Sequence, residues 1–385
     1  MVHISERELQ LPEAVIGKLL KIASEDKNIL SLSVGEPDFI TPKPILDYAK
    51  KIVSKTTHYA PTQGIKELRE AIAKKLKKDN NIKAGPENII VTVGSQEAMF
   101  SSLMCILDPG EQVIVPNPCY LAYTPAIELL NATPIYVKLE QDEDFEINPD
   151  RIKEAVDKKK TKAIIINTPS NPTGNVLTKK TLEEISDIAV ENDLYIISDE
   201  AYEKLIYDDA KHISIGSLNG MQNHVVTIQT FSKSYAMCGF RIGYLHGPAE
   251  LVKAITKSLH YVTLTTSTLS QYLALKALNL PNKYTEKMKQ EYNRRRLYIV
   301  RRLNEIGLRT RMPKGAFYAF SNIKDFKMKS LDFANLLLKK ANVAVVPGTE
   351  FGKFGEGYIR FSYATDIKKI KIGLDRIEEF IKTIK

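Results

Sequence analysis

Short runs of apolar residues alternate with amphipathic stretches between about residues 65 and 250. Most of the runs are apolar on successive residues, which is typical of strands buried on both faces of a parallel sheet. The stretches between them, such as 96–107 and 181–192, carry apolar residues at the three- and four-residue spacing of a helix. We therefore predict an α/β fold, with a mostly parallel central sheet wrapped by helices. The predicted strands are Ile89–Val93, Gln112–Val115, Ile135–Val137, Ala163–Ile166, Tyr195–Ile197, Val225–Ile228 and Ile242–Leu245.

Beyond residue 280 the pattern changes. A long helical pattern runs from Tyr284 to Ile306 and is followed by Gly307, where a left-handed C-cap is expected. The remaining pattern predicts a smaller α+β domain, with strands at Ala316–Phe320 and Val343–Val346, a helix around Leu331–Lys340 and a last helix from Ile367. The Pro- and Gly-rich segment 35–44 is expected to bring the N-terminal arm to this smaller domain. We predict boundaries at 1–45 for the arm and part of the small domain, 46–280 for the large domain, and 281–385 for the C-terminal small domain.

The composition is that of a soluble globular protein. The 385 residues are many for one core, which supports two domains. Hydrophobic residues make up 43% and charged residues 26%, and this balance excludes disordered, collagen-like and coiled-coil chains. The net charge of +9 is spread thinly, which favours solvated helix faces over a nucleic-acid surface. The chain shows neither a membrane-spanning run nor a secretory signal, and its three scattered cysteines form no CxxC pair; we therefore expect a cytoplasmic protein.

Several familiar site motifs are absent. No GxGxxG follows a predicted strand, and the segment Gly348–Lys353 is one residue short of a Walker loop. The six histidines form neither an HxxxH nor an HxH pair, so no metal site is predicted. No GxSxG nucleophile motif occurs either.

Four polar residues follow predicted strands: Asn171, Asp199, Lys233 and Arg241. Open α/β sheets bind ligands at the carboxyl ends of their strands. Taken singly, each residue has an ordinary explanation, because a lone lysine is usually solvated and an Asp-Glu pair or an NPxG segment often only caps a helix or makes a turn. Together their chemistry is complementary, and this favours a common site.

The segments that carry these residues resemble the class I aminotransferases, which are fold-type-I enzymes dependent on pyridoxal 5′-phosphate (PLP). The segments are HYAPTQGIKELREAI, SNPTG, SDEAY and FSKSYAMCGFRIG. The resemblance extends from Leu32–Phe39 to Tyr358–Tyr363, and its detail is similar to the prokaryotic subgroup of aspartate and aromatic amino-acid aminotransferases. It implies that the large domain binds PLP.

The resemblance also implies a role for each residue around the PLP ring. Lys233 would supply the amine that links to PLP and would then move a proton between the substrate α-carbon and the cofactor. Asp199 would keep the pyridine nitrogen protonated. Asn171 and Tyr202 would hydrogen-bond the phenolic oxygen, and Tyr120 would stack on the ring.

A phosphate requires positive charge and hydrogen-bond donors. The residues that the resemblance places around it are Arg241, Thr230, Ser232, and Gly94, Ser95 and Gln96 at a helix start, where free amides attract anions. Thr230 stands where relatives usually carry Gly or Ser. Tyr59 would reach the phosphate of the neighbouring subunit, so the active site would be complete only in a homodimer.

Substrate recognition would fall to Arg360, whose planar guanidinium can bind a carboxylate at two points, with help from Asn171 and the Gly35 amide. Some relatives read dicarboxylates with a second arginine from the partner subunit, but the stretch Tyr261–Gln271 near that region contains no Arg. Aspartate-like and aromatic amino donors therefore both stay open.

The predicted activity is transfer of the α-amino group of an L-amino acid to a 2-oxo acid such as 2-oxoglutarate, by ping-pong kinetics through pyridoxamine phosphate. One alternative is another PLP reaction on the same fold, such as that of a β-lyase or a decarboxylase. The other is a regulatory binding module, but the N-terminal arm is too short for a helix-turn-helix domain. We expect neither nucleic acid nor a membrane as a partner.

Overall fold

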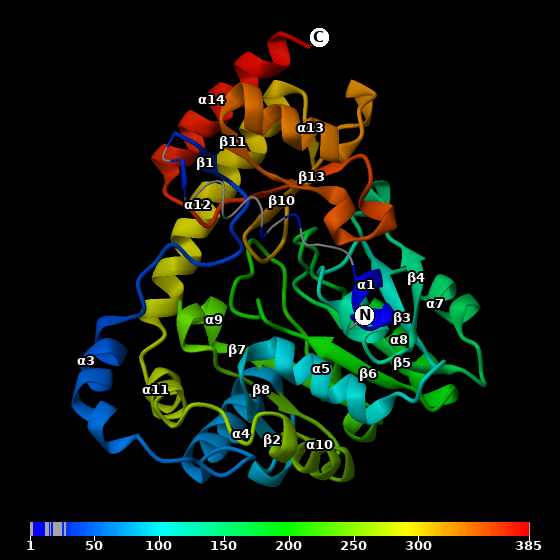
Figure 1. Cartoon of the computed structure of the whole chain (residues 1–385), viewed down its shortest axis with the longest axis vertical. Coiled ribbons are helices and arrows are strands. Elements are labelled where there is room, and N and C mark those ends of the chain that lie inside the picture. Colours follow the sequence, from blue (N-terminus) through cyan, green and yellow to red (C-terminus); the bar gives the residue numbers. More distant parts are fainter. Residues whose placement is uncertain (1–2, 12–14, 16, 18–24, 27, 385) are drawn as a thin grey trace.

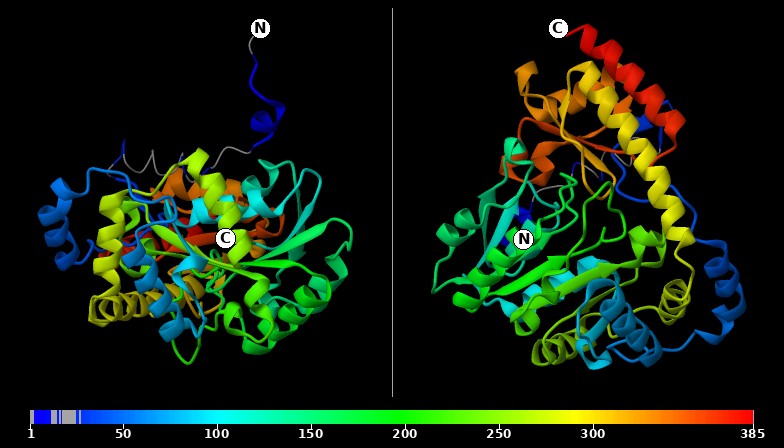
Figure 2. Two further views of the ribbon diagram at one scale, coloured as in Figure 1. Left: turned by 90° about the horizontal axis from the view of Figure 1, so that it is seen from below. Right: turned by 180° about the vertical axis from the view of Figure 1, so that it is seen from behind.

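The computed structural model describes residues 3–11, 15, 17, 25–26 and 28–384. A large α/β part occupies the lower half of Figure 1, and a smaller part built around short strands lies above it. The long helix α12 (Lys283–Ile306) runs between the two parts, as the right-hand view of Figure 2 shows. No helix in the described part of the chain is both long enough and apolar enough to cross a membrane.

The large part is built on a seven-stranded sheet in the order β2-β8-β7-β6-β5-β3-β4. All neighbouring strands are parallel except β8, which is antiparallel to both β2 and β7. The prediction of a mostly parallel central sheet is therefore confirmed. The strands are β2 (Ile89–Thr92), β3 (Gln112–Asn117), β4 (Thr133–Lys138), β5 (Thr161–Asn167), β6 (Tyr195–Asp199), β7 (Val225–Thr230) and β8 (Gly243–His246).

Helices cover both faces of this sheet, which explains why its strands are apolar on successive residues. In β5, Ile164 and Ile166 pack with α7 and α8, whereas Ile165 faces the core formed with α5, α6 and α10. Full burial of each such side chain stabilises the fold by about 1.5–3 kcal/mol. The helices of the large part are α3 (Lys43–Ile52), α4 (Lys66–Asn80), α5 (Gly94–Ile106), α6 (Tyr123–Glu128), α7 (Pro149–Ala155), α8 (Lys179–Glu191), α9 (Phe231–Ser234), α10 (Ala249–Val262) and α11 (Thr268–Leu278).

The smaller part holds an antiparallel sheet in the order β12-β13-β10-β9 and a parallel pair, β1-β11. Its strands are β1 (Leu30–Ser31), β9 (Arg309–Thr310), β10 (Tyr318–Asn322), β11 (Val343–Ala344), β12 (Val346–Pro347) and β13 (Tyr358–Ser362). The helices α13 (Ser330–Leu336) and α14 (Ile367–Lys382) pack with α12 around one core. The short helix α1 (Glu6–Gln10) extends away from the rest of the molecule (Figure 2).

Three local differences from the sequence prediction have simple causes. The predicted strand 343–346 is divided into β11 and β12, because the chain passes from the parallel pair to the antiparallel sheet at Val345. The strand predicted from Ala316 begins two residues later, since Ala316 has a φ of 58°, outside the range of an extended strand. Helix α13 continues as a π-helical turn over Leu337–Ala341. The predicted C-cap is present: Gly307 ends α12 with a φ of 98°.

The segment after residue 28 reaches the smaller part, because β1 pairs with β11. Helix α3 then returns to the large part and contacts α11. The boundaries expected at residues 45 and 280 stay predictions.

Candidate active site

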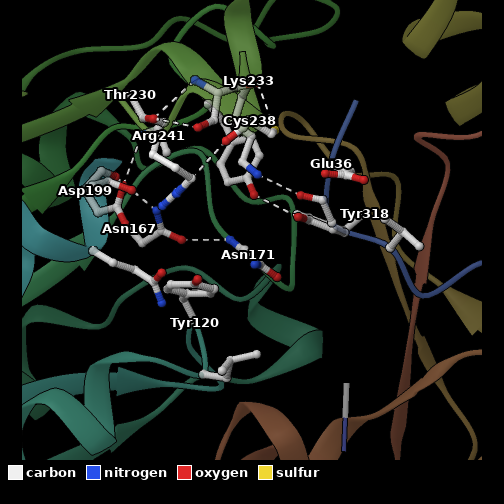
Figure 3. Close-up of a pocket in the computed structure, with 18 of the residues that line it drawn as sticks. Glu36, Tyr120, Asn167, Asn171, Asp199, Thr230, Lys233, Cys238, Arg241 and Tyr318 are labelled. Carbon is white, nitrogen blue, oxygen red and sulfur yellow. Dashed lines mark hydrogen bonds between the residues drawn. The ribbon is translucent and has the colours of Figure 1, made fainter. Parts of the chain in front are cut away.

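A cavity of about 600 Å³ lies at the carboxyl ends of β5, β6 and β7, between the large and small parts (Figure 3). We call it the central cavity. Because these three strands are neighbours in the sheet, the residues that follow them meet at one edge. The residues predicted from sequence that line it are Gly35, Ser95, Gln96, Tyr120, Asn171, Asp199, Tyr202, Thr230, Ser232, Lys233, Arg241 and Arg360.

Lys233 enters the cavity from α9, which begins directly after β7. Thr230 caps this short helix, since its side-chain oxygen accepts a hydrogen bond from the backbone amide of Ser232. The Lys233 ammonium donates to the carbonyl oxygen of Gly35 at 2.7 Å. The Lys233 side chain therefore extends from the end of the large sheet to the N-terminal segment.

Asp199 ends β6 and is 6% exposed. Its carboxylate accepts hydrogen bonds from the Tyr123 hydroxyl at 2.7 Å and from the Ala201 backbone amide at 3.1 Å. Burial raises the pKa of Asp199, while these two hydrogen bonds and the charge of Lys233 oppose that rise. A buried carboxylate of this kind favours a cationic ligand beside it.

The N-terminus of α5 and Arg241 form a positively charged corner of the cavity. Gly94 starts α5 with a φ of 76°, and a Cβ atom there would lie 2.7 Å from the Arg241 Nη2 atom. A Cβ atom at Gly243 would lie 3.0 Å from the Ser95 amide nitrogen. Both glycines thus permit close approach to a helix start, where free amides and the helix dipole attract anions. Gly94 lies behind this corner and does not line the cavity.

Arg360 on β13 is 2% exposed, and its guanidinium lies between two aromatic rings. The guanidinium carbon is 4.4 Å from the centroid of the Tyr318 ring and 4.9 Å from that of Phe351. Nη1 donates to the Asn171 side-chain oxygen at 3.1 Å, and Nη2 donates to the Ser33 carbonyl at 2.6 Å. The buried Nε atom has no hydrogen-bond partner in the described structure. Burial also lowers the pKa of Arg360, so an anionic ligand would stabilise its charge.

Three residues that the sequence analysis did not single out hold these groups in place. Tyr123 binds Asp199, and Tyr318 hydrogen-bonds Tyr202 at 2.8 Å between their hydroxyl oxygens. Asn167 donates to the Asp199 carbonyl and accepts from the Asn171 amide. Only Asn167 had a signal in the sequence, as the polar residue that ends the predicted strand just before Asn171.

Tyr59 does not reach the cavity within one chain. Its side chain is 83% exposed on the surface of the large part.

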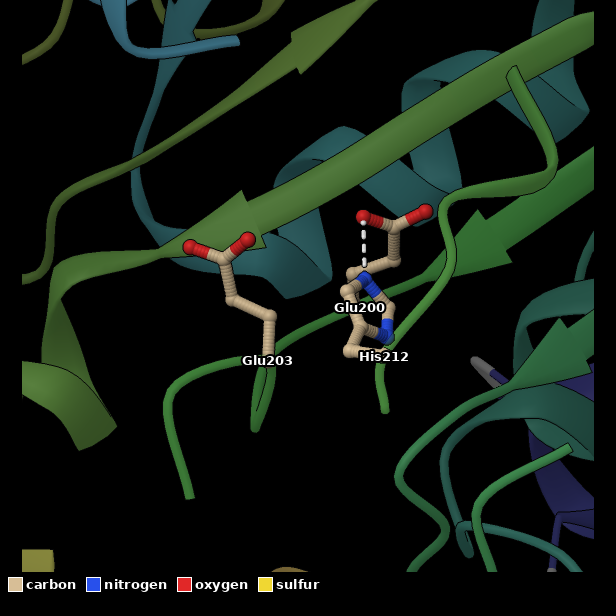
Figure 4. Close-up of side chains that lie close together, drawn as sticks. All are labelled: Glu200, Glu203 and His212. Atoms are coloured by element: carbon tan, nitrogen blue, oxygen red, sulfur yellow. Dashed lines mark hydrogen bonds and ion pairs between the residues drawn. The ribbon is translucent and has the colours of Figure 1, made fainter. Parts of the chain in front are cut away.

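A second cluster of charge begins at Glu200, the residue after Asp199, and Figure 4 shows three of its side chains. We call Lys75, Glu200, Glu203, His212 and Gln229 the Glu200 cluster. The ligand atoms of Glu200, Glu203 and His212 lie within 4.8 Å of one another, as metal ligands would. However, the Lys75 ammonium already contacts Glu203 and Gln229, so these groups have a cation of their own.

The sequence model of one protein family, described as aminotransferase class I and II, matches residues 27–377 of the chain. The chain belongs to this family. It is 48% identical over 371 residues to an aspartate aminotransferase of Pyrococcus abyssi, with 95% of each protein covered. It is 45% identical over 383 residues to aromatic-amino-acid aminotransferase 2 of Thermococcus litoralis, with 98% of each covered.

Solved structures agree with this assignment. An aromatic aminotransferase from Pyrococcus horikoshii OT3 superposes with a TM-score of 0.90 at 46% identity, over 96% of this chain and 99% of that one. An aspartate aminotransferase from Thermus thermophilus with maleate gives a TM-score of 0.93 at 35% identity, over 99% of this chain and 100% of that one. The protein is therefore a PLP-dependent aminotransferase of fold type I, as predicted, and the named relatives do not favour the β-lyase, decarboxylase or regulatory alternatives.

The residues of the central cavity fit PLP and an amino acid. This aminotransferase presents three cationic groups there, Lys233, Arg241 and Arg360, and none of them forms an ion pair with another described residue. A phosphate and a carboxylate would satisfy two of these cations, and PLP links covalently to a lysine amine. The buried Asp199 carboxylate matches a protonated pyridine nitrogen.

Proposed function

We propose that this aminotransferase moves the α-amino group of an aromatic or aspartate-like L-amino acid to a 2-oxo acid such as 2-oxoglutarate. The observation that carries the proposal is the convergence of the Lys233 amine and the Asp199 carboxylate on one cavity, beside two guanidinium groups. The names of the relatives, which include aspartate and aromatic aminotransferases, support both kinds of amino donor.

In this proposal the residues around the cavity hold PLP by its separate chemical groups. Lys233 would link to it, Asp199 would face the pyridine nitrogen, and Tyr120 would stack on the ring. Asn171 and Tyr202 hydrogen-bond the phenolic oxygen. The phosphate would be held by Arg241, Thr230, Ser232, Ser95 and Gln96, while Gly94, which does not line the cavity, would leave room for Arg241 beside the helix start. When bound, PLP supplies an electron sink that stabilises negative charge at the substrate α-carbon.

Lys233 also carries the proton in this mechanism. With PLP and substrate bound, the Lys233 Nζ atom would accept the proton from the substrate α-carbon and return it on the cofactor side. The side chain is half-buried, and its contact with the Gly35 carbonyl keeps the amine inside the cavity. Asp199 contributes by holding the pyridine nitrogen in its charged state throughout.

Arg360 orients the substrate through its α-carboxylate. The guanidinium is fixed before binding, because two rings enclose it and Asn171 and Ser33 accept two of its protons. Its remaining donors include the unpartnered Nε group. Preorganisation of this kind places the α-carbon near Lys233 without further ordering of the protein. Asn171 and the Gly35 amide would complete the contact.

We further propose a homodimer in which Tyr59 reaches the phosphate bound by the partner. The support is the high exposure of large side chains in one chain: Tyr59 is 83%, Tyr261 85% and Val262 62% exposed. Burying such residues in a subunit interface would stabilise the assembly. A cytoplasmic location belongs to the same proposal, and the three free cysteines suit it.

A panel of half-reactions tests the proposed activity. The PLP-loaded protein is mixed with single amino acids, and conversion to pyridoxamine phosphate is followed by absorbance for aspartate, aromatic and branched-chain donors. We expect conversion without release of ammonia or carbon dioxide, and borohydride should attach the cofactor to the peptide that contains Lys233. Elimination or decarboxylation products in place of pyridoxamine phosphate would contradict the proposal.

A further inference from the structure

Tyr318, labelled in Figure 3, contacts both Tyr202, proposed to face the phenolic oxygen of PLP, and Arg360, proposed to bind the substrate carboxylate. We propose that Tyr318 is a positioning residue, whose hydroxyl directs the Tyr202 hydroxyl toward the cofactor and whose ring holds the Arg360 guanidinium in place. The inference rests on the roles proposed above for Tyr202 and Arg360.

The hydroxyls of Tyr202 and Tyr318 hydrogen-bond each other. Their oxygens are 2.8 Å apart, both side chains are buried, and both line the central cavity. Within the described part of the chain, neither hydroxyl has another hydrogen-bond partner. When Tyr318 donates to Tyr202, the Tyr202 proton is left for an acceptor in the cavity. A hydroxyl that accepts a hydrogen bond is also a better donor, because the two bonds polarise each other.

The position of the Tyr318 hydroxyl is fixed by its surroundings. A Cβ atom at Gly35 would lie 2.8 Å from that hydroxyl oxygen, so the N-terminal segment packs directly against it. Gly35 is the same residue whose carbonyl accepts the Lys233 ammonium. On the other side, the ring of Phe317 packs edge-on against Tyr202, with centroids 5.3 Å apart. These contacts leave little freedom for either hydroxyl to turn away.

The ring of Tyr318 reaches Arg360 because of the strand register. Arg360 on β13 lies opposite Phe320 on β10, and Tyr318 is two residues from Phe320, on the same face of the strand. Its ring therefore covers the guanidinium, 4.4 Å from the ring centroid to the guanidinium carbon. One side chain of the small sheet thus contacts both the cofactor-facing and the carboxylate-binding groups.

If Tyr318 only fills space in the core, its hydroxyl should be dispensable. If it positions Tyr202, removal of the hydroxyl should change the cofactor. Tyr318→Phe removes the hydroxyl and keeps the ring over Arg360. In the PLP-loaded protein without substrate, the absorbance of the Lys233-linked cofactor is titrated with pH. We expect the apparent pKa of this chromophore to rise by roughly 0.4 to 1 pH unit, the equivalent of one net hydrogen bond, because Tyr202 stabilises the ionised phenolic oxygen less well.

Three further variants complete the test. Tyr202→Phe should raise the same pKa further, and adding Tyr318→Phe to it should change nothing, because Tyr318 acts through Tyr202. Tyr207→Phe is the matched control: its hydroxyl is buried against the Ala316 carbonyl at 2.6 Å in the same core but does not line the cavity, so the titration should stay as in the parent.

An unchanged titration in Tyr318→Phe, while Tyr202→Phe changes it, would overturn the inference and leave the proposed function intact. Additive effects in the double variant would overturn it as well. If Tyr202→Phe itself has no effect, the proposed role of Tyr202 fails, and this inference fails with it.

The ring is tested separately by binding. Tyr318→Leu should raise the dissociation constant of an unreactive dicarboxylate such as maleate about tenfold relative to Tyr318→Phe, because the guanidinium loses the ring that covers it. Equal dissociation constants in the two variants would refute the contact with Arg360 as a positioning device.

Discussion

The central cavity and the Glu200 cluster each hold a buried carboxylate at the end of β6, yet they differ in whether their charges are paired. Adjacent residues of the chain supply one carboxylate to each, Asp199 to the cavity and Glu200 to the cluster. The Glu200 carboxylate accepts hydrogen bonds from five side chains: Asn80, Ser198, His212, Ser214 and Gln229. In the cavity, the ammonium of Lys233 and the guanidinium of Arg241 bond only to backbone carbonyls among the described residues.

This difference shows which features distinguish a ligand site from a structural core. Charge buried with its partners can stay in the folded protein without a ligand. In the cavity the buried Arg360 has no ion-pair partner among the described residues, which costs free energy that a ligand recovers, whereas Lys233 is half-buried and Arg241 is exposed. Glu200, Glu203 and His212 have the spacing of metal ligands, but Lys75 already pairs with Glu203, and the Glu200 carboxylate is held by its side-chain hydrogen bonds. The unpaired cations are the more informative feature, and they mark the site where phosphate and carboxylate are proposed to bind.

The largest effect is expected from Lys233→Ala. This variant should still bind PLP but should lose multiple turnover by a factor of roughly 10²–10⁴ or more, because the proton carrier is gone. Steady-state transamination measures this loss. The midpoint temperature of thermal unfolding of the cofactor-free protein should not fall, because among the described residues the Lys233 amine bonds only to the Gly35 carbonyl and forms no ion pair. Retained multiple turnover would remove Lys233 from the mechanism.

Removing one partner from the Glu200 cluster should instead lower the stability of the fold. Glu203→Gln should reduce the free energy of unfolding by about 3–5 kcal/mol, because Lys75 is left buried without its carboxylate. Denaturant unfolding measures the change. The matched control is Glu183→Gln, which breaks an exposed pair with Lys179 and should cost about 0.5 kcal/mol or less. Equal unfolding midpoints for the two variants would show that the cluster is not a structural ion pair.

Acid should weaken the same cluster through Glu203, at a lower pH than that at which Asp199 of the cavity takes up its proton, because the pKa of Asp199 is raised and that of Glu203 is lowered. Burial raises the pKa of Glu203, but neighbouring cations, above all Lys75, outweigh it and lower the pKa from 4.5 to about 2. Because the folded-state pKa is depressed, the contribution to stability is complete above pH 4.5 and is lost as the pH falls toward 2. The loss is on the order of 3 kcal/mol. Unfolding measured across this range should depend less on pH in Glu203→Gln than in the parent, and parallel curves would contradict the assignment.

The sequence could predict the residues that lie in contiguous segments at strand ends. Asp199 and Lys233 follow β6 and β7, and neighbouring parallel strands bring such positions together whatever the loops do. The seven strands of the large sheet could also be predicted, because a sheet covered by helices on both faces requires runs of apolar residues. These predictions depend on local patterns alone.

What the sequence could not predict depends on contacts between distant segments. Tyr318 is 116 residues from Tyr202, and Tyr123 is 76 residues from Asp199. The local sequence around each residue does not reveal such a pairing, because it depends on how the sheets are placed in the folded protein. The division of 343–346 between two sheets has the same cause, since the change of partner at Val345 is a tertiary event. The place of Tyr59 depends on a second chain and stays a prediction.

Arg360→Lys should have the smallest of these effects, and it tests the cavity with a change that keeps the charge. An ammonium cannot bind a carboxylate at two points, and it lacks the planar group that the guanidinium presents to the rings of Tyr318 and Phe351. The loss of a charge-assisted hydrogen bond corresponds to about 10–100-fold weaker binding of the amino acid. The concentration that gives half the maximal rate in single-turnover half-reactions measures it, with PLP binding as the control. An affinity equal to that of the parent would place carboxylate recognition elsewhere, and the orphaned Nε of Arg360 would then need another explanation.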